Sequence, residues 1–484
     1  RRHTRLQGDW SSDVCSFRSK PFFFMKIKLK ENRKNIITDT TTPVSMYLKI
    51  RDKYINSILL ESSDYSSKDN NYAYICFNPI AEFKIKNFDL KISLPNKKTI
   101  SKKLSKSDNV MDELKDFIET FQFESSFEND KFQKDGVFGY MSYDSVKYFE
   151  TLNLTNISHG DDIPEMIYCV YEHIIVVNVF NNTTTIISYS ENKNSIIEIE
   201  KLISNQRINK SHFEKIGDIE SNMNDEEFIN LVNKGIYHCN RGDVFQIVLS
   251  RKFFQKFKGD EFAAYRKLRS VNPSPYLFYF DFGDFKIFGS SPEAQLIVNN
   301  NKAEIHPIAG TFKRTGNDDY DRDKALELSK DDKENSEHMM LVDLARNDLS
   351  ISCNEVSVEK DREIQFYSHV IHLVSKVTGL LKNKSMNIIS NTFPAGTLSG
   401  APKYRAMELI NNYEKTKRNF YGGAIGMIDS NLNFNHAIII RSILSKNQML
   451  YFQAGAGVVA KSNPKNELQE VYNKIGAIIK TLED

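Results

Sequence analysis

The chain has 484 residues, of which 40% are hydrophobic and 12% aromatic, which is enough for a large packed core. The formal net charge is only +2, so the composition does not indicate nucleic acid or an anionic membrane surface as the main partner. The longest apolar runs, such as IIVVNVF at 174–180, have the length of a strand and are too short to span a bilayer.

The five cysteines are scattered through the chain without the spacing of a metal site. This pattern predicts reduced thiols and a cytoplasmic location. Residues 1–24 hold the only tryptophan and show no periodicity. We therefore expect 1–24 to be a non-native leader, with Met25 as the start of the natural chain.

The first part of the chain alternates apolar runs with loops rich in Ser, Asn, Lys and Asp. These runs predict strands at 72–80, 138–144, 166–180 and 183–190, with a helix at 108–121. The polar stretch 205–224 predicts a linker. We therefore expect an N-terminal domain over 25–205 and a catalytic domain over 225–484.

The second part begins with an amphipathic helix over 224–243 that ends at Gly242, followed by a strand over 244–253. Residues 276–291 predict a hairpin that turns at Gly283 and Asp284. Further helices are predicted at 318–349, 363–369, 402–413 and 464–482, and further strands at 370–380, 422–429, 436–445 and 449–453. Antiparallel strands interleaved with helices predict an α+β fold of layered antiparallel sheets with flanking helices.

Two pairs of glutamates stand out in this second part. Glu334 and Glu337 lie in KENSEHMMLVDLARND, and Glu467 and Glu470 lie in NPKNELQEVYNKIGAI. Spacing of three residues in a helix puts both carboxylates of a pair on one face, and Lys474 follows on the face of the second pair. Such pairs are often only solvated helix faces, but four carboxylates brought together need a cation. Oxygen ligands favour Mg²⁺ over zinc, under an anionic substrate.

The motifs of residues 242–484 resemble those of one family. The matching segments are GDVFQIVLSR, NPSPYLFYFDFGDFKIFGSSPE, HPIAGTFKR, KENSEHMMLVDLARNDL, SHVIHLVSKVTG, FPAGTLSGAPKYRAMELI, YGGAIG, AIIIRS and YFQAGAGVVA. Their order and spacing are similar to those of chorismate-utilising enzymes, and in detail of anthranilate synthase large subunits. The resemblance implies the fold of that family and an enzyme that acts on chorismate.

The resemblance also implies roles for particular residues. The implied catalytic residues are Glu293 as general acid, His372 as the group that assists loss of pyruvate, and Thr397. The implied substrate-binding residues are Gln246, Ala309, Gly310, Thr311, Tyr421, Arg441, Gly455, Ala456, Gly457 and Lys474. Glu337 and Glu470 would bind Mg²⁺ directly, with Glu334 and Glu467 as supporting carboxylates.

Two positions distinguish the reactions of the family. Members that add water to chorismate carry a lysine base where this chain has Gln246, and an amide cannot act as that base. Members that make 4-amino-4-deoxychorismate carry a nucleophilic lysine where this chain has Ala309. The pair therefore predicts that ammonia attacks and pyruvate leaves, which gives anthranilate in the first step of tryptophan biosynthesis.

A regulatory site is also implied. LLES at 59–62 and NPSPYLFY at 272–279 resemble the two segments that bind tryptophan for feedback inhibition in anthranilate synthases. The expected effector residues are Leu60, Glu61, Ser62, Pro275, Tyr276 and Leu277. Each segment alone is also compatible with an ordinary strand end or a proline turn.

The sequence shows no Gly-x-Cys-x-Gly elbow of a glutaminase. The resemblance then implies a hetero-oligomer in which a glutamine amidotransferase subunit, anthranilate synthase component II, supplies ammonia. Two alternatives stay open. One is aminodeoxychorismate synthase component I of the folate pathway, and the other is a non-catalytic regulatory protein that binds tryptophan or chorismate. The segments AGTFKRTG, NDLSIS and HLVSK depart from the family pattern.

Overall fold

The structure, a computed structural model, describes residues 26–62, 71–127, 130–156, 160–205, 212–366 and 370–483. The side chains of residues 309, 311, 313, 318, 332, 333 and 370 also lie outside the description. The expected leader, residues 1–24, therefore lies outside the described part of the chain, as does Met25.

The helices are α1 (Pro43–Arg51), α2 (Val110–Glu119), α3 (Ser195–Ser204), α4 (Asp225–Arg241), α5 (Glu261–Val271), α6 (Asp318–Lys330), α7 (Asp332–Ser352), α8 (Asn387–Thr392), α9 (Gly396–Ser399), α10 (Lys403–Tyr413) and α11 (Pro464–Leu482), with a 3₁₀ helix, η1 (Tyr143–Tyr148). No helix within the described ranges combines the length and the apolar character that a bilayer crossing requires.

The strands are β1 (Ile27–Lys30), β2 (Asn32–Ile37), β3 (Ile58–Glu61), β4 (Tyr72–Lys86), β5 (Asp89–Ser93), β6 (Thr99–Lys103), β7 (Phe121–Glu124), β8 (Val137–Met141), β9 (Met166–Asn178), β10 (Thr183–Ser188), β11 (Phe213–Ser221), β12 (Gln246–Gly259), β13 (Tyr276–Asp281), β14 (Phe285–Ser291), β15 (Ala294–Asn299), β16 (Lys302–Ile305), β17 (Ile308–Lys313), β18 (Cys353–Phe366), β19 (Val370–Leu381), β20 (Gly400–Ala401), β21 (Ala424–Ile428), β22 (Phe434–Ile438), β23 (Ser442–Lys446) and β24 (Met449–Val458).

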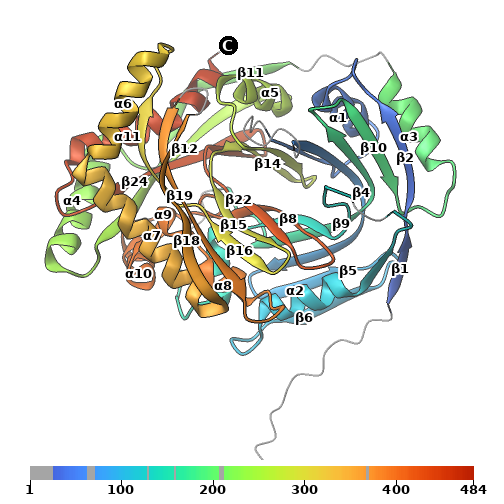
Figure 1. Ribbon diagram of the computed structural model, residues 1–484, viewed down its shortest axis with the longest axis horizontal. Coiled ribbons are helices and arrows are strands. Elements are labelled where there is room, and N and C mark those ends of the chain that lie inside the picture. The colour runs from blue at the N-terminus through green and yellow to red at the C-terminus, as the bar shows by residue number, and fades with distance from the viewer. Residues whose placement is uncertain are drawn as a thin grey trace, which may run out of the picture.

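Antiparallel pairing connects nearly all of these strands, and β1 with β7 forms a separate parallel pair. Strands from the two halves of the chain pair directly, since β3 lies beside β13 and β8 lies beside β21. Figure 1 shows the N-terminal strands on one side of the molecule and the C-terminal half on the other. The α+β class with antiparallel sheets is confirmed. The expected boundary between two domains stays a prediction, while the strands of both ranges share one sheet.

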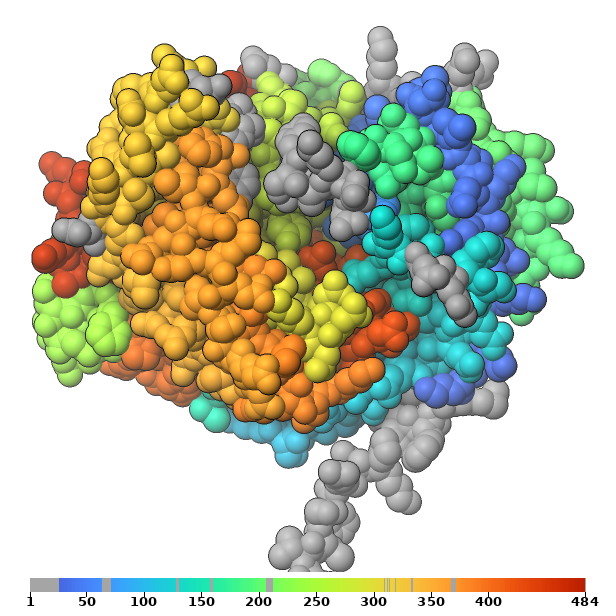
Figure 2. Space-filling view, in the orientation of Figure 1, coloured from blue at the N-terminus to red at the C-terminus, as the bar shows by residue number. Residues whose placement is uncertain are grey.

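Helices cover the outside of this sheet. Helix α11 contacts β24, α4 and α5, and together these helices close one hydrophobic core. Helix α7 contacts β17, β18 and β19, and Figure 1 shows α6 and α7 along the outer side of these strands. In the space-filling view, their yellow and orange surface forms one side of the visible face and the blue and cyan N-terminal strands form the other (Figure 2).

Local sequence signals explain the helices that the sequence predicts correctly. Helix α4 begins at a capping box in which Asn224 and Glu227 satisfy each other's backbone N–H groups. It ends at Gly242, whose φ of 84° lies in the left-handed region that glycine tolerates. Its buried side includes Phe228 and Leu231. The structure also confirms the predicted helices near 108–121, 402–413 and 464–482 and the hairpin at 276–291.

Four expectations need correction. Residues 353–366 form strand β18 where a helix was expected from 363, and the expected linker contains strand β11. Both strands are mostly exposed, so their polar side chains hide the strand pattern. The helical region 318–349 is two helices, because Asp331 ends α6 and its carboxylate accepts a hydrogen bond from the Glu334 N–H at the start of α7. The strand expected at 436–445 is two strands, β22 and β23, interrupted before Ser442.

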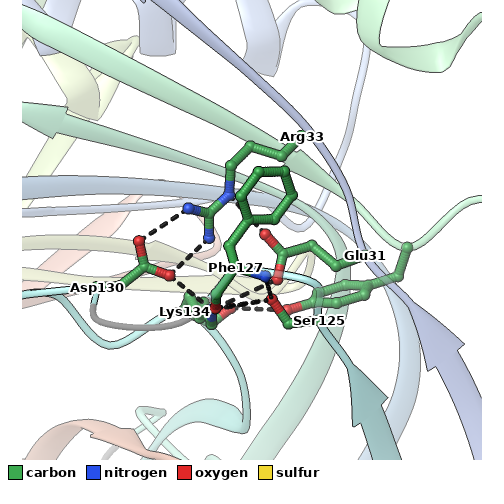
Figure 3. A network of polar contacts seen from close by, with 7 residues as sticks. Glu31, Arg33, Ser125, Phe127, Asp130 and Lys134 are labelled. Carbon is green, nitrogen blue, oxygen red and sulfur yellow. Dashed lines mark hydrogen bonds and ion pairs between the residues drawn. The ribbon is translucent and has the colours of Figure 1, made fainter.

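A cluster of charged side chains links β2 to Asp130 and Lys134 (Figure 3). Arg33 on β2 donates two hydrogen bonds of 2.8 Å to the carboxylate of Asp130, and its guanidinium carbon lies 4.4 Å from the centre of the Phe127 ring. Lys134 donates to the same carboxylate at 2.6 Å. Paired carboxylate–guanidinium contacts have a defined geometry, so the cluster holds the chain around Gln133 against the sheet.

Candidate active site

A cavity of about 240 Å³ lies where β12 and β24 face α7 and α11. Its lining includes most of the residues that the sequence predicts for catalysis, substrate and metal. These are Gln246, Glu293, Gly310, Glu337, His372, Thr397, Tyr421, Arg441, Gly455, Gly457, Glu470 and Lys474. They come from segments more than two hundred residues apart, so the fold gathers them.

The floor of the cavity is a pair of strands with small residues. Gly455 and Gly457 alternate along β24, and the side chain of Ala456 between them is buried in the core on the other side. The structure therefore does not bring Ala456 to the cavity, because successive residues of a strand point to opposite faces. A methyl group on Gly457 would lie 2.3 Å from Nε2 of Gln246, so this glycine makes room for the Gln246 side chain.

Glu293 follows strand β14, and hydrogen bonds hold both its backbone carbonyl and its side-chain carboxyl group. Its backbone carbonyl accepts a hydrogen bond from Ile438 N–H at 3.0 Å. Its Oε1 accepts a hydrogen bond of 3.0 Å from the Thr397 hydroxyl. Burial raises the pKa of this carboxyl from 4.5 to about 7, although Thr397 and Lys474 oppose the shift. Near neutral pH a large part of Glu293 therefore keeps its proton.

His372 lies on β19, opposite the strand that carries Gly310. Its Nδ1 lies 3.1 Å from the carbonyl oxygen of Gly310, which can only accept, so Nδ1 carries the proton of the neutral ring. Burial lowers the pKa of His372, and Arg441 lowers it further. The imidazole is therefore neutral at pH 7, with Nε2 as its basic nitrogen.

Arg441 interrupts the sheet between β22 and β23. Its φ of 51° lies in the left-handed region, which is uncommon for arginine and ends the strand. Its guanidinium donates a hydrogen bond of 2.6 Å to the backbone carbonyl of Lys474 on α11. The loop therefore brings a half-buried cation to the cavity wall, where a strand would have continued the sheet.

Helix α11 supplies two charged groups to the same cavity. Lys474 donates hydrogen bonds to Gly455 O at 2.8 Å and to Glu470, whose carboxylate lies 2.5 Å away. Glu337 on α7 faces the cavity from the other side. Within the described ranges no three acidic, histidine or cysteine side chains gather as a complete metal site. Glu337 and Glu470 thus line two walls of the cavity.

The supporting carboxylates lie outside the cavity lining. Glu467 is buried in the first turn of α11. Glu334 has its Oε2 3.2 Å from the position of a methyl group on Gly310, so it lies directly behind the wall. The backbone of β17 passes this point, but the side chains of Ala309 and Thr311 lie outside the described part of the structure.

Sequence reasoning missed the buried polar support beneath Tyr421. Arg418 donates to both carboxylate oxygens of Glu414, at 2.8 and 2.6 Å, and its guanidinium lies 5.8 Å from the Tyr421 ring centre. Glu414 in turn accepts from the hydroxyl of Ser250 at 2.7 Å, and Ser250 accepts from Gln453 at 2.7 Å. Gln453 lines the cavity, and its place two residues before Gly455 on a strand could have indicated it.

A second cavity, of about 230 Å³, lies at the junction of β3 and β13. All of the expected effector residues line it: Leu60, Glu61, Ser62, Pro275, Tyr276 and Leu277. Pairing of the two strands sets Glu61 opposite Leu277. Gln133, which precedes Lys134 of the charged cluster in Figure 3, forms another part of the wall.

Residues 60–480 match the family described as chorismate binding enzyme. The chain belongs to this family. It is 34% identical to anthranilate synthase component 1 of Aquifex aeolicus (strain VF5) over 93% of each chain. It is 36% identical to the protein of the same name from Bacillus subtilis (strain 168), over 92% of this chain and 90% of that one.

Solved structures agree with this assignment. Anthranilate synthase component I from Streptococcus pneumoniae TIGR4 is 32% identical and superposes with a TM-score of 0.73, over 84% of this chain and 92% of that one. The menaquinone-specific isochorismate synthase of Escherichia coli is 17% identical with a TM-score of 0.70, over 94% and 95%, which shows the shared fold alone. The expected family, fold and enzymatic nature are confirmed.

Proposed function

We propose that the chain is the synthase subunit of an anthranilate synthase, which converts chorismate and ammonia into anthranilate and pyruvate in the cytoplasm. The observation that carries the proposal is that one cavity is lined by a carboxyl group with a raised pKa, a histidine and two cations. Chorismate carries two carboxylates, a hydroxyl that must leave and an enolpyruvyl group that must be lost, so each group has a partner of suitable chemistry.

The first half-reaction needs a proton at the departing hydroxyl. Ammonia forms a bond to C2 of the ring while the bond from C4 to its hydroxyl breaks. Glu293 gives its proton to that oxygen, which leaves as water. A carboxyl with a pKa of about 7 is still protonated in part at neutral pH, and Thr397 orients it by its hydrogen bond to Oε1.

The second half-reaction needs a base. The C2 hydrogen is removed, the ring becomes aromatic and the enolpyruvyl oxygen leaves, to appear as pyruvate after protonation of its methylene carbon. The neutral ring of His372 presents a basic Nε2, because Nδ1 already bonds Gly310. Arg441 and Tyr421 lie on the wall near which we place the enolpyruvyl group, where the cation of Arg441 stabilises the departing oxygen.

We propose Mg²⁺ as the metal that the family resemblance implies. Glu337 and Glu470 provide hard oxygen donors on two walls, and Mg²⁺ commonly takes one or two carboxylates and completes its shell with substrate and water. When bound, the ion would hold the ring carboxylate of chorismate and neutralise its charge. Lys474 would then exchange part of its contact with Glu470 for the substrate.

Ammonia is proposed to come from a separate amidotransferase subunit. The cysteines that the structure describes are poor nucleophile candidates, since burial raises the pKa of Cys76, Cys169, Cys239 and Cys353. We also propose that tryptophan occupies the second cavity as a feedback inhibitor, since both expected segments meet there. A cavity of this size accommodates an amino acid with an aromatic side chain.

A product assay tests the proposal. The purified chain is given chorismate, Mg²⁺ and excess ammonium at alkaline pH, and anthranilate fluorescence and pyruvate release are followed together. Equal formation of both supports anthranilate synthase. Amination without pyruvate would instead assign aminodeoxychorismate synthase, and binding of chorismate without turnover would assign a regulatory protein.

A further inference from the structure

A small chamber of about 30 Å³ lies directly behind the general acid. Glu293, Leu341 and Thr397 line both this chamber and the main cavity, so the two spaces adjoin at the acid. The far wall is formed where α7 and α9 pack closely, and a methyl group on Gly396 would lie 2.1 Å from Leu344. A volume of this size has room for one water molecule, since roughly 10–15 Å³ is the minimum for one.

The chamber contains a polar atom that no protein group satisfies. Gln295 is buried, with 3% of its surface exposed, and lines the chamber but not the main cavity. Its Oε1 has no hydrogen-bond partner among the described residues. A buried acceptor without a donor is costly, so such atoms usually bind ordered water.

The orientation of the Gln295 amide is fixed by its neighbour. Its Nε2 donates a hydrogen bond of 3.2 Å to the Thr392 hydroxyl. That hydroxyl has a single hydrogen, which it gives to the carbonyl of Ile388 at 2.9 Å, so it can only accept from Gln295. The amide nitrogen therefore faces Thr392, and the oxygen is left as an acceptor without a partner.

An ion pair borders the chamber on the same side. Asp348 on α7 accepts a hydrogen bond of 2.6 Å from Lys403, which also donates to the backbone carbonyl of Thr392 at 3.1 Å. From the main cavity, Lys474 is the charged group that acts on Glu293.

We infer that this chamber is a binding site for one water molecule, which donates one hydrogen bond to Gln295 Oε1 and the other to the Glu293 carboxylate. The inference deepens the proposed function, on which it rests. When Glu293 gives up its proton, a carboxylate develops whose hydrogen-bond donor among the described residues is Thr397. The water supplies a second donor as the negative charge develops. It therefore stabilises the transition state more than it stabilises the enzyme–chorismate complex. Gln295 is a positioning residue, since it acts through the water.

Two measurements test the inference. The first is a high-resolution crystal structure of the unaltered enzyme, in which we expect a water molecule within hydrogen-bond distance of Gln295 Oε1 and of Glu293. A dry chamber would overturn the inference. This test does not depend on the folding of any variant, nor on which product the enzyme makes.

The second measurement is steady-state kinetics of Gln295→Met, a variant of similar shape that lacks the acceptor. We expect kcat to fall about tenfold with an unchanged KM for chorismate, because the lost contact matters only as charge develops. The matched control is Gln255→Met, since Gln255 on β12 is another buried amide whose Oε1 has no partner among the described residues, and it lines neither cavity.

Each kinetic outcome decides the matter. A kcat within twofold of the unaltered enzyme, an equal loss in Gln255→Met, or a rise in KM in place of the loss in kcat would count against the water site. If the unaltered enzyme makes no anthranilate, the proposed function fails on its own. The crystallographic water then still decides whether the chamber is a water site.

Discussion

Glu293 shows how desolvation gives a carboxyl group the raised pKa that the proposed acid catalyst needs. The sequence offers only a glutamate after GSSP, and its surroundings set its chemistry. Desolvation raises the pKa to about 7, while Thr397 and Lys474 keep the shift from going further. The same burial has a cost, because the folded enzyme must enclose a charge whenever Glu293 ionises.

Glu293→Gln should therefore lose activity and gain stability in alkaline solution. We expect kcat to fall by about a thousandfold, since general acid catalysis commonly contributes 10²–10⁴. Between pH 4.5 and about 7 the folded enzyme keeps a proton that the unfolded chain has released. The free energy of unfolding of the natural enzyme thus falls as pH rises through this window, by roughly 3 kcal/mol.

The glutamine variant has no proton to release and escapes that loss. Thermal unfolding of both proteins at pH 5 and pH 8 measures the difference, which should be larger at pH 8. An equal difference in melting temperature at the two pH values would show that Glu293 does not titrate in this range in the folded enzyme.

Glu470→Gln tests the proposed metal. Removing one anionic oxygen donor should raise the Mg²⁺ concentration needed for half-maximal activity by at least about tenfold. The matched control is Glu408→Gln on α10, a partly exposed glutamate that pairs with Arg405 three residues earlier, as Glu470 pairs with Lys474. Titration of activity with Mg²⁺ gives the result, and an unchanged dependence on Mg²⁺ would exclude Glu470 as a ligand.

At the scale of elements, the pleat of β24 decides which of its residues line the main cavity. The sequence QAGAGVV predicts a close approach of backbone to ligand, and the strand places Gly455 and Gly457 on the cavity face. Ala456 was expected beside them, but the predicted strand ended at 453, whereas β24 continues to Val458 and its pleat turns Ala456 into the core. Period-two alternation would have excluded it had the strand been extended in the prediction.

Gly457→Ala should disturb the site without unfolding the protein. The new methyl group would meet Nε2 of Gln246, the end of a flexible side chain, which must move into the cavity. We expect kcat/KM for chorismate to fall about tenfold, with a change in unfolding free energy of about 1 kcal/mol at most. The control is Gly476→Ala on α11, where a methyl group meets nothing within 4 Å and should stabilise the helix slightly. Kinetics and thermal melts of both variants separate the two effects.

The elements that the sequence could predict are determined by local residues, whereas the others depend on pairing with distant parts of the chain. Helix α4 and the hairpin of β13 and β14 carry their own caps and turn residues, so local sequence determines them. The edge strands β11 and β18 are mostly polar and exposed, and they exist because a partner strand pairs with them. Arg441 has no local signal for its left-handed φ, so its position in a loop could not be read from AIIIRS.

At the scale of the whole molecule, both cavities depend on contacts between distant parts of the chain. Motif resemblance predicted most of the catalytic lining, because the motifs carry the chemistry. It could not predict the network of Arg418 and Glu414 or the chamber at Gln295, which arise from packing around the motifs. The departure HLVSK places Lys376 in an ion pair with Glu304 at 2.9 Å, outside the lining of the main cavity.

The second cavity joins the two halves of the chain, and this offers a physical basis for regulation. Strand β3 pairs with β13, whose next strand, β14, leads directly to Glu293. A ligand that prefers one arrangement of β3 and β13 can therefore bias the position of the acid, provided that it binds the two arrangements with different affinity. The proposed tryptophan site borders both strands, because residues of both segments line it.

Ser62→Phe tests this coupling, because the larger side chain would fill part of the second cavity. We expect the inhibition constant for tryptophan to rise at least about tenfold, while kcat stays within twofold because the main cavity is untouched. Ser62→Ala is the matched control: it adds no volume, so it should keep most of the inhibition if space is what the phenylalanine removes. Inhibition curves for the three proteins at fixed chorismate give the answer. Equal inhibition of the phenylalanine variant and the natural enzyme would place the effector elsewhere, whereas loss of both inhibition and kcat would show that β3 supports the catalytic half directly.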